Sequence, residues 1–215
     1  MSDPASLLVD EAGNVLLLDA AQGNIRRFSC DGRWLETLAP ADASSNLLSG
    51  PRDFVLDFGG ALVIADTNAD RLLRIGSDRA SLLAIENLDL YEPRSVCCGP
   101  DGSLLVADTN NSRIVQVLAD GNSRVLVSGK ERLEFPSRVR ASSDNSFFAV
   151  LDRGASRVQR FNFSGERTSE ILVASGLETA AGSSVALDDL ALDSAGQAIL
   201  INPARESLLI LGFVE

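Results

Sequence analysis

The sequence predicts an all-β fold, a β-propeller built from five four-stranded repeats. A pattern of an apolar strand, a polar residue and a second apolar strand recurs five times along the 215 residues. Successive copies are 42 to 50 residues apart, a period that suits one four-stranded propeller blade. Turns rich in Gly, Asp and Asn separate the strands, and no helical pattern of any length interrupts them.

The polar residue that ends the second strand of each copy is called the anchor here. In every copy the apolar third strand resumes six residues after the anchor. A shorter innermost strand and a turn precede each second strand, as in Val96-Cys97-Cys98 followed by Gly99-Pro100-Asp101-Gly102. The anchors are Asp19, Asp66, Asp108, Asp152 and Asn202.

The repeats predict a single domain over residues 1–215, with blades at about 3–40, 50–88, 92–130, 135–175 and 186–215. The fifth blade has three strand candidates and ends with Leu208 to Val214. We therefore expect an exposed strand edge there. Two alternatives stay open, a complete ring of five blades and an open ring or part of a six-bladed parent. Long connections between blades, residues 39–50 and 174–186, are further places where specificity could be added.

The third repeat carries a fuller motif, and the second and fourth repeats keep much of it. In the third repeat this motif consists of Pro93, Asp101-Gly102, Ala107-Asp108-Thr109-Asn110 and Arg113-Ile114. On these residues the chain resembles the NHL-repeat family of β-propellers, over essentially its whole length. The first and fifth repeats depart from the pattern, since Asn24 and Ser207 stand where the arginine is expected.

We expect the anchors to be structural. An Asp or Asn side chain in a turn accepts hydrogen bonds from backbone N–H groups of the residues that follow it. A catalytic role for four carboxylates in register is the less favoured alternative. Arg71, Arg113 and Arg157 are expected to pair with a nearby carboxylate or turn carbonyl.

Residues at the start of the innermost strands form the candidate binding set, because in a propeller they surround the mouth of the central channel. They differ from blade to blade, as a recognition surface requires. Their arginines could accept an anionic group, or the mixed charges could simply neutralise one another. Arg140 lies inside an innermost strand and needs either a ligand or a carboxylate partner. The candidates are Arg52, Asp53, Arg94, Ser95, Arg138, Arg140, Asp188 and Asp189.

The absence of histidine from the chain removes several kinds of chemistry. Ser-His-Asp and Cys-His catalysis and His-ligated metal sites all need an imidazole. Some NHL-like propellers are amidating lyases that hold zinc through histidines, and this chain cannot reproduce that site. Related lactonases hold a divalent metal on oxygen ligands, for which Asp53, Asp188 and Asp189 are candidates by position. We predict no catalytic residue, no metal and no cofactor.

The amino-acid composition limits the kinds of partner and compartment expected for the chain. The chain has 30 acidic and 19 basic residues, a net charge of −11, which opposes binding to nucleic acid. Three cysteines, Cys30, Cys97 and Cys98, form no disulfide framework and favour a reducing, cytoplasmic compartment. Apolar runs such as Ser207–Leu211 are too short to enter a membrane as a helix. The leading prediction is a non-catalytic scaffold that binds a protein partner through propeller loops or the exposed blade edge. The alternative is a metal-assisted hydrolase of the lactonase type.

Overall fold

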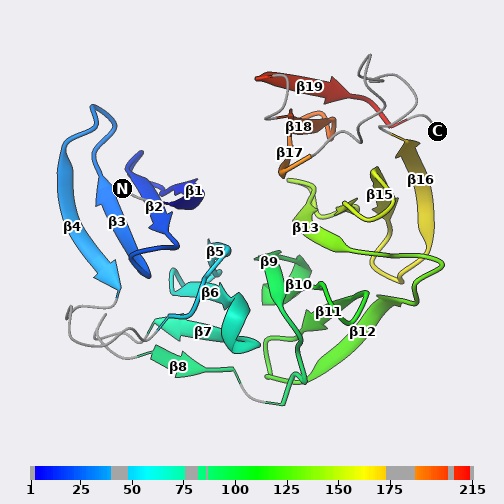
Figure 1. The fold of residues 1–215 in the computed structure, drawn as a ribbon, viewed down its shortest axis with the longest axis horizontal. Coiled ribbons are helices and arrows are strands. Elements are labelled where there is room, and N and C mark those ends of the chain that lie inside the picture. The colour runs from blue at the N-terminus through cyan, green and yellow to red at the C-terminus, as the bar shows by residue number, and fades with distance from the viewer. Residues whose placement is uncertain are drawn as a thin grey trace. The chain divides into compact units, whose positions relative to one another are not determined.

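Short runs of β-branched and apolar residues between turns form the strands of the chain. The computed structural model describes residues 3–39, 48–75, 82–85, 87–172, 187–202 and 206–213. In these residues nineteen β-strands form five antiparallel sheets, each joining strands consecutive in the sequence (Figure 1). The fold is a β-propeller of five blades, which confirms the predicted fold class. None of the described helices is long and apolar enough to span a membrane.

The strands have the following bounds. The first sheet contains β1 (Pro4–Val9), β2 (Val15–Asp19), β3 (Asn24–Phe28) and β4 (Trp34–Ala39). The second contains β5 (Asp53–Leu56), β6 (Leu62–Asp66), β7 (Arg71–Ile75) and β8 (Leu82–Ala84), with the 3-10 turn η1 (Thr67–Ala69) between β6 and β7. The third contains β9 (Pro93–Cys98), β10 (Leu104–Asp108), β11 (Arg113–Val117) and β12 (Ser123–Ser128), with η2 (Pro100–Gly102) after β9. The fourth contains β13 (Pro136–Ala141), β14 (Phe148–Asp152), β15 (Arg157–Phe161) and β16 (Arg167–Leu172). The fifth contains β17 (Asp189–Leu192), β18 (Ala198–Asn202) and β19 (Ser207–Leu211).

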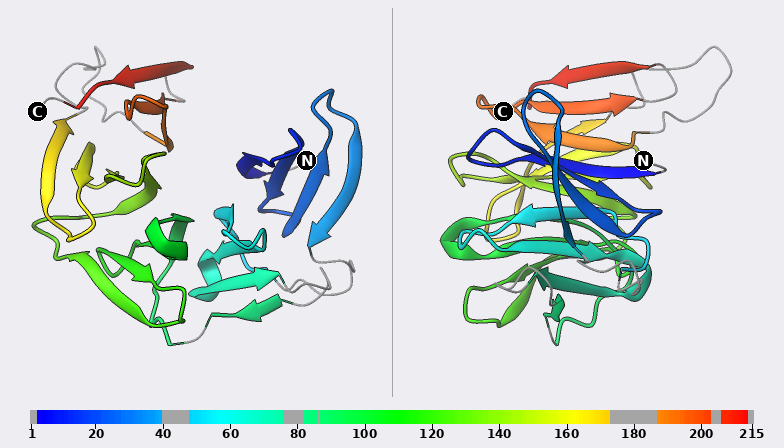
Figure 2. Two further views of the ribbon diagram at one scale, coloured as in Figure 1. Left: turned by 180° about the vertical axis from the view of Figure 1, so that it is seen from behind. Right: turned by 90° about the vertical axis from the view of Figure 1, so that its left-hand side faces the viewer.

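The fifth sheet has three strands in the part of the chain that the structure describes, in the order β17-β18-β19. This confirms the prediction of a shorter last blade. Both views of Figure 2 show β19, in red, as the outermost strand of this sheet. Most of the two long connections, residues 39–50 and 174–186, and the side chain of the fifth anchor, Asn202, lie outside the described residues.

Two compact units make up the chain, residues 1–98 and residues 99–215. The single domain expected from the repeats stays a prediction. In the first unit, the core between the first two sheets includes Leu18, Ile25, Ile64 and Leu73, all 2 % exposed or less. In the second unit, the core between the fourth and fifth sheets includes the residues Leu151, Val158, Leu190 and Leu200.

The second strand of a blade is the most deeply buried. All five residues of β6, β10 and β14 are buried, so neighbouring structure covers both faces of these strands. The strand β19 differs, because its residues alternate between partly buried and exposed. Successive side chains of a strand point to opposite faces. Only one face of β19 is therefore covered.

The turn between the third and fourth strands of the fourth sheet requires glycine. Gly165 has a φ of +85°, and a Cβ built there would lie 2.1 Å from the backbone oxygen of Leu126. Gly121 occupies the corresponding turn of the third sheet with a φ of +87°, and its Cβ would meet no atom within 4 Å. Both glycines have a left-handed backbone, but only Gly165 lies close to another segment. Substituting each in turn therefore distinguishes the energetic cost of the backbone conformation from that of the close approach.

We expect Gly121→Ala to lower the free energy of unfolding by about 1–2 kcal/mol, the cost of a left-handed conformation for a residue with a Cβ. Gly165→Ala should cost a further 1–3 kcal/mol, approximately, because the added methyl group forces the turn away from Leu126. Urea unfolding followed by circular dichroism measures both. Equal losses for the two variants would contradict the close approach at Gly165.

Candidate functional site

The strand register places the candidate binding residues at equivalent points of their blades. Asp53 pairs with Ala65, Arg138 with Leu151 and Asp189 with Ile201, in each case the residue just before the anchor. In the first blade Ser6 occupies this point, opposite Leu18. These residues lie within the first three positions of β1, β5, β13 and β17.

In the first unit Asp53 is the centre of a buried cluster and is 1 % exposed. Its Oδ1 accepts hydrogen bonds from the Ser6 hydroxyl (2.8 Å) and the Phe54 N–H (3.0 Å). Its Oδ2 accepts hydrogen bonds from the Ser95 hydroxyl (2.7 Å) and the Val96 N–H (3.2 Å). The carboxylate thus connects the innermost strands β1, β5 and β9. A carboxylate with both oxygens occupied in this way is suited to holding strands together.

In the second unit Asp189 lies next to two guanidinium groups. Arg138 donates from Nε to its Oδ1 at 2.8 Å, and Nη2 of Arg140 lies 3.9 Å from the same oxygen. The Leu190 N–H also donates to Oδ1, at 2.9 Å. Arg140 further donates to the carbonyl of Val139 at 2.9 Å. Of the two roles considered for Arg140, the structure displays contact with a carboxylate.

The remaining candidates are Asp188, Arg94 and Arg52. Asp188 forms an ion pair with Arg153 at 3.2 Å. The Asp188 side chain is 50 % exposed and the Arg153 side chain is 36 % exposed. Arg94 lies 3.4 Å from Glu92, and Arg52 is exposed. The structure thus joins Asp53 with Ser95, and Arg138 and Arg140 with Asp189. Arg153, the partner of Asp188, follows the anchor Asp152 in the sequence. The candidate set contains only residues near the innermost strands, so it does not include Arg153.

The anchors Asp19, Asp66, Asp108 and Asp152 are all 0 % exposed, and the arginine five residues later pairs with three of them. These pairs join Arg71 to Asp66, Arg113 to Asp108 and Arg157 to Asp152, and their Nε donors lie on one carboxylate oxygen. Burial raises the pKa of Asp66, while the Ser49 N–H and the Arg71 guanidinium act to lower it. The local pairing expected for the three arginines is therefore observed.

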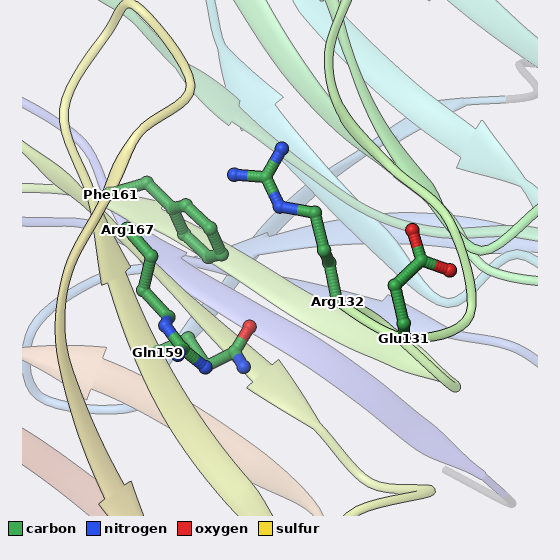
Figure 3. A pocket seen from close by; sticks show the side chains of 5 residues that line it. All are labelled: Glu131, Arg132, Gln159, Phe161 and Arg167. Carbon is green, nitrogen blue, oxygen red and sulfur yellow. The ribbon is translucent and has the colours of Figure 1, made fainter.

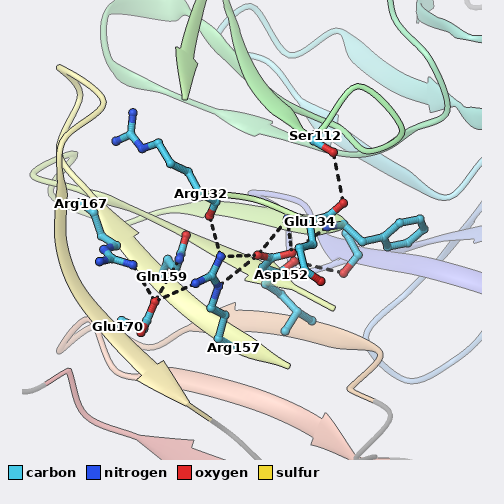
Figure 4. A network of polar contacts seen from close by, with 11 residues as sticks. Ser112, Arg132, Glu134, Asp152, Arg157, Gln159, Arg167 and Glu170 are labelled. Atoms are coloured by element: carbon cyan, nitrogen blue, oxygen red, sulfur yellow. Dashed lines mark hydrogen bonds and ion pairs between the residues drawn. The ribbon is translucent and has the colours of Figure 1, made fainter. Parts of the chain in front are cut away.

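Two of the anchors have backbone partners other than the expected ones. Asp19 does accept the N–H of Gln22 in the following turn, at 3.1 Å. Asp152 instead accepts the N–H groups of Glu134 (3.1 Å) and Phe135 (2.8 Å), which precede the innermost strand of the same blade (Figure 4). Asp66 binds the N–H of Ser49 in the same manner. These carboxylates therefore fix the entry to the blade in addition to its central turn.

The described residues contain no group of three or more His, Cys, Asp or Glu side chains placed to hold a metal ion. Asp53 lies in the first unit, while Asp188 and Asp189 lie in the second. Each of the three carboxylates is already occupied by hydroxyl, N–H or guanidinium donors. Within each unit the geometry supports strand-to-strand linkage more directly than metal binding.

We expect Asp53→Asn to lower the free energy of unfolding by roughly 1–3 kcal/mol, because an amide cannot accept four hydrogen bonds and its NH₂ group would face a donor. Asp188→Asn removes a carboxylate from a half-exposed ion pair and should change stability by only about 0–1 kcal/mol. Urea unfolding of both variants tests the difference. A cost for Asp53→Asn no larger than that for Asp188→Asn would show that the buried cluster does not stabilise the blades.

Comparisons with known proteins agree with this fold. The model of the NHL repeat family matches residues 90–117, which form most of the third repeat. Comparison with curated proteins gave no match.

Among solved structures, the chain is similar to a catalytically inactive histidine-to-alanine variant of virginiamycin B lyase from Staphylococcus aureus with quinupristin. The identity is 17 %, the TM-score is 0.70, and the match covers 99 % of this chain and 69 % of that one. It is also similar to a chain of the nidogen/laminin complex, with 22 % identity, a TM-score of 0.69 and coverage of 94 % and 77 %. A protein described as a gluconolactonase matches with 17 % identity, a TM-score of 0.72 and coverage of 99 % and 75 %. At these identities the similarity is one of fold.

Proposed function

We propose, on the premise that the chain is an NHL-repeat β-propeller, that it is a non-catalytic module that binds a partner protein through its fifth sheet. The observation that carries this proposal is an exposed apolar sheet face next to a sheet edge that no strand of the described residues covers. The two features occur on the same strand, β19.

One face of the fifth sheet is covered, and the opposite face is exposed. Leu190, Leu200 and Leu209 pack toward the fourth sheet. On the other face, Leu208 is 66 % and Ile210 is 63 % exposed. The register pairs Leu208 with Ile201, which is 42 % exposed. Large apolar side chains grouped on one surface are typical of protein interaction sites.

The edge of β19 supplies the second part of the argument. In the other four sheets the third strand, β3, β7, β11 or β15, is hydrogen-bonded to a strand on each side. In the described residues β19 pairs with β18 alone. A free strand edge presents unpaired N–H and C=O groups, and an extended segment of another protein can add to it. We infer that the partner contributes such a strand, in the place that a fourth strand occupies in the other blades.

The fold is compatible with this role. One of the similar structures is a complex between nidogen and laminin, in which the matching chain is part of a protein assembly. The likeness extends to the fold alone, so it supports a module that binds proteins without naming the partner.

The enzyme alternatives have less support. In the similar lyase structure, one histidine is replaced by alanine and the variant is catalytically inactive. This chain contains no histidine that could take the place of that residue. A metal-assisted hydrolase of the lactonase type would need carboxylate or amide oxygens that converge on an ion. Asp53, Asp188 and Asp189 are engaged with other groups, so nothing observed favours that reaction over binding.

We expect the double substitution Leu208→Asp and Ile210→Asp to weaken partner binding strongly. Burial of each side chain by a partner contributes roughly 1–2 kcal/mol, so their joint loss should weaken binding by about thirtyfold to several hundredfold. The measurement is affinity capture from an extract of the source organism, with the recovered proteins quantified by mass spectrometry.

The matched control is Val125→Asp, on the outer strand β12, where the valine is 47 % exposed. This variant adds an acidic group to an exposed strand without touching the fifth sheet. The proposal predicts a set of proteins recovered with the wild type and the control but not with the double variant. Recovery of the same proteins at the same levels with all three would overturn it.

A further inference from the structure

The fourth blade contains a cavity of about 330 Å³ that shares no residue with the candidate site described above. It is lined by Glu131, Arg132, Gln159, Phe161 and Arg167 (Figure 3). The residues come from β15, β16 and the segment before β13, all within the second unit. A cavity of this size lies at the lower end of the range for small-molecule sites.

Gln159 gives the cavity an acceptor that the protein does not satisfy. The residue is 0 % exposed, and its Nε2 donates to Glu170 Oε2 at 3.1 Å. The reverse amide orientation would turn an oxygen toward that carboxylate, so Glu170 fixes the orientation. Oε1 is then buried without a hydrogen-bond partner, and Figure 3 shows it directed toward the space between Arg132 and Phe161. A buried acceptor without a donor is costly, so this oxygen calls for a donor from a bound molecule.

Two guanidinium groups border the same space. Arg132 donates from Nη2 to the carbonyl of Gly165 at 2.7 Å, and its guanidinium lies 6.0 Å from the ring centroid of Phe161. Arg167 pairs with Glu170 at 2.8 Å. A guanidinium carries five N–H donors, so each retains donors for a ligand. Arginine is well suited to bind a carboxylate.

The lining also contains one carboxylate, that of Glu131. The site therefore combines two cationic donors with a carboxylate and an unsatisfied amide oxygen. A ligand that carries only an anionic group would use the arginines but leave Gln159 without a donor. A ligand that carries only a cationic group would leave the arginines unused.

We propose that this cavity binds a small zwitterion with the chemistry of a free amino acid. Its carboxylate is held by Arg132 and Arg167, and its ammonium group donates to Gln159 Oε1. The site goes beyond the protein-binding role of the fifth sheet, and it uses none of the residues on which that role depends.

The test is a titration of the ¹⁵N-labelled chain followed by amide chemical shifts. L-Alanine serves as the zwitterionic probe, with propionate and ethylamine as probes for each charged group alone. We expect saturable shifts centred on β15 with L-alanine, and binding at least about tenfold weaker for propionate and ethylamine, because each lacks one set of charge-assisted contacts. Equal binding of propionate and L-alanine, or no saturable shift with L-alanine, would overturn the proposal.

Variants locate the binding. Arg167→Gln removes the guanidinium of a side chain that is 48 % exposed. It should weaken L-alanine binding by about tenfold, since one charge-assisted contact is lost. Gln159→Leu should remove binding, with the fold checked by the amide spectrum. The matched control is Arg124→Gln, whose guanidinium donates to Gln116 away from the cavity, and it should bind as the wild type does. Unchanged affinity in Arg167→Gln, or equal weakening in Arg124→Gln, would exclude this cavity as the site.

Discussion

The structure depends on covering both faces of each sheet. A β-strand places alternate side chains on opposite faces, so an apolar strand buried on one side alone leaves the other side in water. The second strands β6, β10 and β14 satisfy this requirement fully, with every residue buried. The fifth sheet satisfies it on one side only, where Leu190 and Leu200 pack toward the fourth sheet. The exposed Leu208 and Ile210 follow from the same alternation.

Buried carboxylates provide the second type of connection between strands. Asp152 ties β14 both to the arginine that follows it and to backbone N–H groups ahead of β13. Asp53 connects three innermost strands through two serine hydroxyls. A buried carboxylate must be matched by donors, and here those donors come from neighbouring strands of the fold. In the sequence these acidic residues could suggest a catalytic site, whereas in the structure they connect neighbouring strands through hydrogen bonds.

Much of the fold could be predicted from the sequence because the repeat fixes spacing as well as composition. The pairing of Asp108 with Arg113 spans a single hairpin, so the local sequence is enough to predict it. The three strands of the last blade could likewise be read from the sequence along that blade. The partners of Asp66 and Asp152 could not be read in this way, since Ser49 and Glu134 lie 17 and 18 residues away in the sequence. The pairing of Arg138 with Asp189 joins residues 51 positions apart, which no turn rule specifies. The cavity beside Gln159 was missed for the same reason, because its lining comes from three separate segments.

The central claim is that the exposed face and edge of the fifth sheet belong to a protein interface. The most direct measurement is the native mass of the protein isolated gently from its source, with every chain identified and amide exchange of β19 followed in the same preparation. The account predicts a complex with a protein partner in a fixed ratio and slow exchange of the β19 amides. A lone chain whose β19 amides exchange freely would contradict it.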